Sequence, residues 1–120
     1  MPVVFTPDMI NPEEHLRKSS RTGAMRAEQI LLDDPDTGMM IKTQGYPAGD
    51  FTPLHTHSCA HGFYVLKGTL RTSFGDFPPG SFVWIPEGEA CTHGATEDEG
   101  VYTLFITNKP FDIHYIEDEG

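Results

Sequence analysis

The chain is poor in basic side chains. It carries 8 Lys and Arg against 18 Asp and Glu among 120 residues, which gives a formal net charge of −10. A surface of this sign repels phosphate backbones and anionic lipid headgroups. We therefore expect neither nucleic acid nor a membrane among the partners of this protein.

Long apolar runs and cysteines are scarce as well. No stretch approaches the ~20 consecutive apolar residues of a membrane-spanning helix. Residues 1–8 lack the basic start and the apolar core of a signal peptide. The two cysteines, Cys59 and Cys91, could form one disulfide at most. We expect a cytoplasmic protein in which both are free thiols, because that compartment is reducing.

Glycine and proline, by contrast, are abundant, with 12 and 10 residues. The chain also has 38% apolar residues and 13 aromatic side chains, too many for a disordered protein. The excess of glycine and proline therefore indicates turns between short strands, which is typical of an all-β sandwich or barrel. The predicted strands are 24–32, 39–44, 51–57, 61–67, 69–74, 81–85, 90–95, 101–107 and 111–116.

The first 23 residues have a different pattern. Asn11 as N-cap, Pro12 at the first helical position and two acidic residues after it predict a short helix that ends near Ser19 or Ser20. We expect residues 1–23 to form an arm packed on the barrel or on a second subunit. Residues 24–116 would form the barrel and residues 117–120 an acidic tail.

Histidine is unevenly distributed, because four of the six lie between positions 55 and 93. In a strand, His55 and His57 project from one face roughly 6.5–7 Å apart and can share a metal at ~2.0–2.2 Å. His61 would lie ~13 Å from His57 on a continuous strand. The chain must therefore turn at residues 58–60 for His61 to join the pair, and His93 is the fourth candidate ligand.

Glycines and a proline surround these histidines at fixed intervals. The first segment is Gly49-x5-His55-x-His57-x3-His61-x6-Gly68, and the second is Gly80-x5-Pro86-x-Gly88-x4-His93. Together they resemble the two motifs of the cupin superfamily. The resemblance implies an antiparallel jelly-roll β-barrel that holds one metal ion.

The sequence departs from the cupin pattern at the ligands. His61 stands where most cupins have glutamate, and Cys91 stands where the histidine of the second motif is expected. His93 follows two residues later, so both side chains can face the interior of the barrel. We favour His93 over Cys91 as the ligand, and the alternative for Cys91 is a small buried residue of the core.

A set of imidazoles suits several divalent transition metals, of which we favour Fe(II), with Zn, Ni, Mn or Cu as alternatives. Because no carboxylate neutralises the ion, such a site favours an anionic, chelating substrate. Cupins similar to acetylacetone dioxygenase and the dihydroxyacetophenone dioxygenases have all-histidine sites, and this resemblance implies Fe(II), a bidentate carbonyl or aromatic substrate and O2. The alternatives are a metal-assisted isomerase or lyase, and a non-catalytic sensor of a small ligand.

Further residues could line a substrate pocket or an interface. Arg71 could pair with a substrate carboxylate and Glu89 could act as a base. Three strands, 63–66, 82–85 and 102–106, are apolar on both faces, which predicts a homodimer because one barrel needs only one dry face. The pocket candidates are Phe63, Val65, Trp84, Cys91 and Tyr102.

Overall fold

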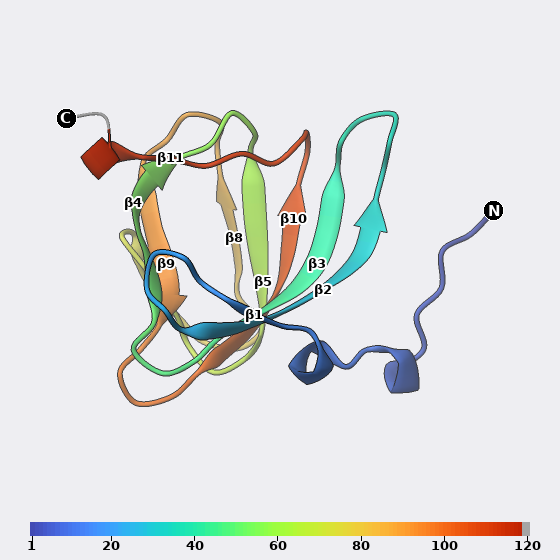
Figure 1. Ribbon diagram of the computed structural model, residues 1–120, viewed down its shortest axis with the longest axis horizontal. Coiled ribbons are helices and arrows are strands. Elements are labelled where there is room, and N and C mark those ends of the chain that lie inside the picture. The colour runs from blue at the N-terminus through green and yellow to red at the C-terminus, as the bar shows by residue number, and fades with distance from the viewer. Residues whose placement is uncertain (119–120) are drawn as a thin grey trace.

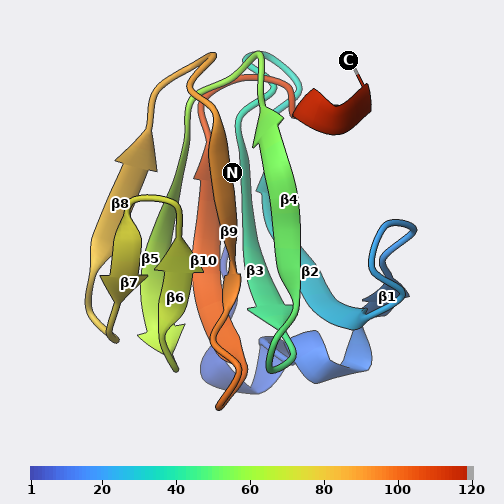
Figure 2. The same cartoon turned by 90° about the vertical axis from the view of Figure 1, so that its left-hand side faces the viewer.

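In a computed structural model, which describes residues 1–118, the chain folds into two antiparallel sheets that face each other (Figures 1 and 2). The strands are β1 (Leu16–Lys18), β2 (Met25–Asp33), β3 (Met40–Tyr46), β4 (Phe51–Thr56), β5 (His61–Lys67), β6 (Leu70–Thr72), β7 (Gly75–Phe77), β8 (Phe82–Ile85), β9 (Cys91–Ala95), β10 (Val101–Thr107) and β11 (His114–Tyr115). Three 3-10 turns, Pro7–Met9, Pro12–Glu14 and Ile116–Asp118, complete the elements.

One sheet has six strands in the order β1-β2-β3-β10-β5-β8, and the other has five in the order β11-β4-β9-β6-β7. The core between them is a cluster of buried apolar side chains, among them Phe63, Val65 and Phe105. The predicted all-β antiparallel jelly-roll barrel is therefore confirmed. No helix within residues 1–118 is long and apolar enough to cross a membrane.

The N-terminal segment differs from the prediction in one respect. The predicted short helix is present as the single turn Pro12–Glu14, but its extension toward Ser20 is wrong. Leu16–Lys18 instead forms β1, which pairs with Met25–Ala27 of β2. Backbone hydrogen bonds to a neighbouring strand outweigh the helix-start signal here, since an isolated short helix is marginal in water. The predicted arm thus contributes a strand to the six-stranded sheet, and Glu119 and Gly120 of the predicted tail lie outside the described residues.

An irregularity in β4 decides which side chains enter the barrel. Thr52 pairs with His93 and His55 pairs with Cys91, so the two residues between Thr52 and His55 oppose a single residue of β9. Such a bulge reverses the in–out alternation of a strand. As a result both Thr52 and His55 are buried, whereas Leu54 is exposed.

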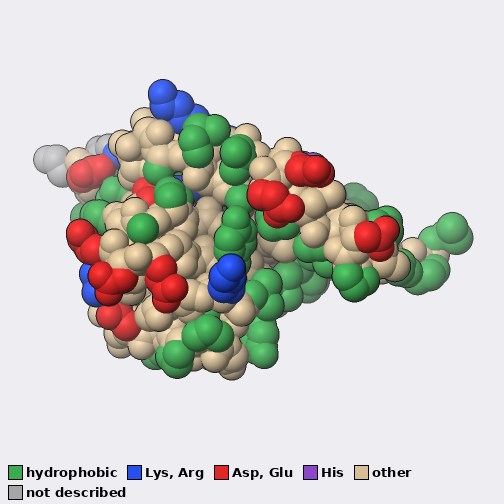
Figure 3. Space-filling model, turned by 90° about the horizontal axis from the view of Figure 1, so that it is seen from below, with side chains coloured by type: hydrophobic (Ala, Val, Ile, Leu, Met, Phe, Trp, Pro, Cys, Tyr) green, Lys and Arg blue, Asp and Glu red, His purple; other side chains and the backbone are tan. Residues whose placement is uncertain are grey.

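The outer face of the six-stranded sheet is apolar around β5 and β8. Tyr64 pairs with Phe82, and Leu66 and Trp84 extend the same outward face. All four side chains are between 42% and 58% exposed. Acidic side chains are scattered over the face shown in Figure 3.

Candidate metal centre

Five buried side chains that can ligate a metal converge between the two sheets. One ligand atom of each can be chosen so that all five atoms lie within 4.8 Å of one another. His55 and His61 are fully buried, and His57 and His93 are 3% and 4% exposed. We call this group the histidine cluster: His55, His57, His61, Cys91 and His93.

Local backbone structure explains the convergence. His55 lies on β4 and faces Cys91 of β9 across the sheet. The chain then turns at residues 58–60, as predicted, so that His61 opens β5 of the opposite sheet. Four motif glycines, at positions 49, 68, 80 and 88, have positive φ. At Gly68 a Cβ atom would come within 2.2 Å of the carbonyl oxygen of Gly100, so glycine is required at this turn.

Three of the imidazoles are oriented through Nδ1. His55 Nδ1 donates to the carbonyl oxygen of Pro53 at 2.6 Å, and His57 Nδ1 donates to the carbonyl oxygen of Asp112. Because a carbonyl only accepts, both Nδ1 atoms carry the proton and both Nε2 atoms keep a free lone pair. His93 Nδ1 lies 3.0 Å from the hydroxyl of Tyr46. Such contacts typically orient histidines that ligate metals.

Burial also keeps the cluster uncharged. It lowers the pKa of His55 to about 4 and that of His61 to about 3. Burial and the neighbouring histidines lower the pKa of His93 well below its ordinary value. Neutral imidazole is the form that binds a metal ion, so the histidines are in the ligating state at neutral pH.

The cysteine is in a different state. Burial raises the pKa of the Cys91 thiol to about 12, and its Sγ lies 3.6 Å from His55 Nε2 and 3.9 Å from His61 Nε2. A thiol must lose its proton to bind a metal, whereas the imidazoles need not. The geometry therefore admits Cys91, and the protonation state favours His93.

The donor set fits a divalent transition metal. His57 Nε2 is buried and has no hydrogen-bond partner among the described residues, and the Nε2 atoms of His55 and His93 lie 3.1 Å apart. Two adjacent ligand atoms, each ~2.1 Å from one metal ion, lie ~3.0–3.4 Å apart. The 3.1 Å separation of these two Nε2 atoms therefore suits neighbouring ligands of one ion.

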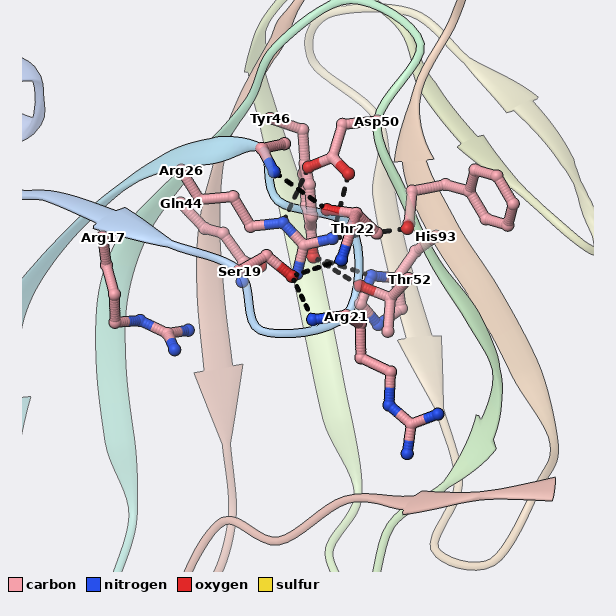
Figure 4. A network of polar contacts seen from close by, with 12 residues as sticks. Arg17, Ser19, Arg21, Thr22, Arg26, Gln44, Tyr46, Asp50, Thr52 and His93 are labelled. Atoms are coloured by element: carbon pink, nitrogen blue, oxygen red, sulfur yellow. Dashed lines mark hydrogen bonds and ion pairs between the residues drawn. The ribbon is translucent and has the colours of Figure 1, made fainter. Parts of the chain in front are cut away.

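A cavity of about 230 Å³ adjoins the cluster, and His57 and His93 lie in its lining. Facing them is a group of polar side chains from β1, β2 and β3 that we call the charged wall: Arg17, Arg26, Glu28, Lys42 and Gln44. Figure 4 shows part of it, together with Tyr46 and His93 and the loop that follows β1. The N-terminal segment therefore closes one side of the cavity.

Ion pairs hold the charged wall together. Glu28 accepts two hydrogen bonds from Arg17, at 3.0 and 3.1 Å, and one from Lys42 Nζ at 3.2 Å. Burial alone would raise the pKa of Glu28, but the Arg17 hydrogen bond and the Lys42 charge outweigh it and hold the pKa at about 2. Arg26 pairs with Asp50 at 2.7 Å, and both are nearly buried. Burial lowers the pKa of the Lys42 ammonium.

The predicted pocket residues are divided between the two sides of the sheet. Phe63 and Val65 are fully buried in the core, and Phe63 lies 5.7 Å from His61 between ring centroids. Trp84 does not line the cavity, because it pairs with Gly62 and so points outward, where it stacks on Phe82. Tyr102 also points outward, against Gly45.

Two other predicted residues lie at the surface. Arg71 pairs with Asp76 at 3.3 Å and is half exposed, and Glu89 is exposed. The cations of the charged wall were not predicted as site residues. A signal was present, because Arg26 and Glu28, and Lys42 and Gln44, repeat at the two-residue spacing of one strand face. That pattern ordinarily indicates a solvated face.

Comparison with known protein families agrees with this architecture. Residues 17–112 match the family model of the ChrR cupin-like domain. The chain belongs to this family. No curated protein sequence matches this chain.

Several solved structures share the fold of this chain. A cupin-like protein from Thermotoga maritima is 18% identical with a TM-score of 0.69, over 78% of this chain and 77% of that one. The DMSP lyase DddQ from Ruegeria pomeroyi is 18% identical with a TM-score of 0.68, over 89% and 59%. A chain in the complex of Rhodobacter sphaeroides SigE with the anti-sigma ChrR is 21% identical with a TM-score of 0.62, over 77% and 48%. The chain thus spans only about half to three fifths of the last two.

Proposed function

We propose that this protein is an Fe(II)-dependent dioxygenase that acts on a small anionic carbonyl or aromatic compound able to chelate the metal. The observation that carries the proposal is the buried cluster of neutral histidines beside a cavity with cationic walls. His55, His57, His61 and His93 would hold the ion. When bound, Fe(II) supplies a Lewis acid for the substrate and a site at which O2 can react.

The chain's own residues prepare the cavity for such a substrate. Arg17 and Lys42 share a single carboxylate, Glu28, so this part of the wall has an excess positive charge that attracts an anion. Phe105 and Phe111 line the cavity and give it an apolar side. Pro53 and Asp112 fix the protons of His55 and His57 on Nδ1, so that Nε2 of each is free for the metal.

The proposal is tested by metal analysis followed by oxygen uptake. We expect the purified protein to contain iron, and to consume O2 in proportion to substrate when given Fe(II) and a panel of β-diketones and hydroxyketones. His55→Ala should abolish both metal content and uptake. Native zinc or nickel combined with turnover in the absence of O2 would contradict the dioxygenase.

A metal-assisted isomerase or lyase is the second candidate, and one observation favours it. Burial lowers the pKa of Lys42, which lines the cavity, and an ammonium of lowered pKa can transfer protons to and from a substrate. This enzyme would work anaerobically and would exchange substrate hydrogen with solvent deuterium. Loss of that exchange in Lys42→Met would distinguish it from the oxygenase.

A non-catalytic sensor is the third candidate, since one neighbour in fold is a chain of a complex of a sigma factor with its anti-sigma ChrR. The cavity would then bind a small ligand without changing it. A ligand that binds tightly and is recovered intact from the metal-loaded protein would support this role over both enzymes.

A homodimer also belongs to the proposal. The apolar patch of Tyr64, Leu66, Phe82 and Trp84 would cover the same patch of a second copy. We expect Phe82→Glu to shift the mass measured by light scattering from dimer to monomer. Phe74→Glu, at a residue that is similarly exposed but lies between β6 and β7, should leave the mass unchanged.

A further inference from the structure

The charged wall contains hydrogen-bonding groups that the protein itself does not satisfy. Lys42 is 7% exposed, and its ammonium has three N–H groups. Within residues 1–118 its single hydrogen-bond acceptor is Glu28. Gln44 is 6% exposed, and its Oε1 has no partner in the described part of the chain. Both side chains line the cavity beside the histidine cluster.

The two groups call for opposite partners. A lysine ammonium only donates, so Lys42 can bind an oxygen that carries negative charge. Gln44 Nε2 donates to Glu28 Oε1 at 3.4 Å. The side-chain oxygen of Gln44, Oε1, is therefore left as an acceptor that requires a donor. A carboxylate and a hydroxyl in one small molecule would satisfy both, and a buried group left without a partner is costly.

The net positive charge of the wall disfavours an amino acid of similar size. An amino acid also offers a carboxylate and a donor, but its ammonium would lie near Arg17, Arg26 and Lys42, whose three positive charges outnumber the negative charges of Glu28 and Asp50. Repulsion among like charges in a partly buried site disfavours it. A neutral hydroxyl meets no such repulsion, so the wall selects hydroxy acids over amino acids.

Aromatic rings connect this pair of groups with the histidines. The Lys42 ammonium lies 5.5 Å from the centroid of Phe111, whose ring lies 5.2 Å from that of His57. The ring of Phe105 likewise lies between Lys42 and His61. Its centroid is 5.1 Å from Lys42 Nζ and 5.7 Å from the centroid of the His61 ring. Phe105 and Phe111 therefore each contact both Lys42 and a histidine of the cluster. A volume of about 230 Å³ equals that of roughly eight water molecules at ~30 Å³ each, which suits a short hydroxy acid.

We infer that Lys42 and Gln44 form the specificity site for a small hydroxy carboxylate, in which Lys42 binds the carboxylate and Gln44 Oε1 accepts from the hydroxyl. This inference rests on the proposed function, since it supplies the substrate class for that cavity. It concerns binding only, so it holds for an oxygenase, a lyase or a sensor alike.

The test is calorimetry on the zinc-loaded protein, because Zn²⁺ is redox-inert and no oxidative turnover complicates the titration. Lactate, propionate and alanine are the probes, since they differ only in a hydroxyl, a hydrogen and an ammonium at C2. We expect lactate to bind at least roughly tenfold more tightly than propionate or alanine. Lactate alone donates a hydroxyl to Gln44 Oε1 without bringing an ammonium group beside the cations of the wall. Equal affinity for lactate and propionate would overturn the role of Gln44.

Two substitutions assign the contacts. Lys42→Met should weaken lactate binding by roughly 10- to 100-fold, as expected for the loss of a charge-assisted hydrogen bond. Lys42→Arg, which keeps the charge, should retain most of the affinity. Gln44→Leu should reduce the affinity for lactate to that for propionate. Arg71→Met, at a cation outside the cavity, is the control and should change nothing.

Zinc affinity is measured first for every variant, by competition with a chromogenic chelator. Failure of the wild-type protein to bind zinc would contradict the metal centre of the proposed function. Tight zinc binding without any lactate binding, or with lactate binding that Lys42→Met does not weaken, would overturn the specificity site alone. Circular dichroism of each variant verifies that the fold is intact.

Discussion

The two walls of the cavity are built on different principles. The histidine cluster is uncharged, and contacts from Pro53, Asp112 and Tyr46 orient three of its imidazoles. The charged wall on β1, β2 and β3 is held by ion pairs: Glu28 binds Arg17 and Lys42, and Arg26 binds Asp50 before β4. One wall is suited to a metal ion and the other to an anion, so together they favour a negatively charged ligand that also reaches the metal.

On both walls, some polar groups have hydrogen-bond partners within the protein and others have none. On the charged wall, Arg26 is paired with Asp50, whereas Lys42 and Gln44 keep free hydrogen-bonding capacity. In the cluster, His57 Nε2 is a free atom. The paired groups stabilise the cavity wall, and the free groups are the ones available to a metal and a ligand. Substitutions on each wall should separate these roles.

The largest effect is expected from the buried ion pair. Arg26→Met leaves Asp50, whose side chain is 4% exposed, without a cation, and should lower the free energy of unfolding by ~3–5 kcal/mol. Urea denaturation followed by fluorescence measures it. Arg71→Met breaks the half-exposed pair with Asp76 and should cost under ~1 kcal/mol. Equal effects of the two substitutions would show that the charged wall is not a structural element.

The next effect separates the two candidates for the last metal ligand. His93→Ala should weaken zinc binding by roughly 100-fold or more, more than the 10- to 100-fold typical of residues that only orient a ligand. Cys91→Ala should leave the affinity unchanged, because burial raises the pKa of Cys91 and so disfavours the thiolate that a metal would bind. Competition with a chelator gives both values. The reverse order would assign the ligand to Cys91 and make His93 a hydrogen-bonding neighbour.

The difference between the walls also explains what could be predicted from sequence. The histidine cluster follows a motif with fixed spacing, so the sequence alone predicts that His55, His57, His61 and His93 come together. The charged wall follows only the alternation of strand residues, at Arg26, Glu28, Lys42 and Gln44. Sequence alone does not say which face of each strand lies inside a two-sheet barrel.

Other differences between prediction and structure have equally local causes. Trp84 is predicted to line the pocket, but the register with β5 turns it outward, because Ile85 rather than Trp84 lies opposite His61. The segment after Glu14 joins a sheet because a neighbouring strand is available, which a helix-start signal does not reveal. Local sequence patterns do not predict which distant strands pair with each other.

A smaller effect is expected where the walls meet. Tyr46 lies on β3, two residues after Gln44, and its hydroxyl contacts His93 Nδ1 at 3.0 Å and Thr52 Oγ1 at 3.3 Å. Tyr46→Phe removes the group that orients His93 while leaving all ligands in place. Zinc affinity should fall by roughly 10- to 100-fold, with the stoichiometry kept at one. Unchanged affinity would mean that the packing of His93 alone orients its ring.

The smallest effect tests the charged wall through pH. Glu28 has a pKa of about 2 in the folded protein against an ordinary value of 4.5, because Arg17 and Lys42 stabilise its charge. A lowered pKa stabilises the fold above the ordinary value, and this contribution is lost as the pH falls from about 4.5 toward 2. Glu28→Gln lacks the contribution at every pH.

The wild-type protein should therefore be more stable than Glu28→Gln at pH 7, by ~1–2 kcal/mol once solvent screening of the partly exposed Arg17 is allowed for. The difference should shrink steadily below pH 4.5 in urea melts. Glu13→Gln, at an exposed carboxylate, serves as the control and should give a difference near zero throughout. A gap between wild type and Glu28→Gln that stays constant down to pH 2 would mean that packing of the side chain, rather than its charge, stabilises the wall. In that case the excess positive charge beside the metal centre would lose its structural basis.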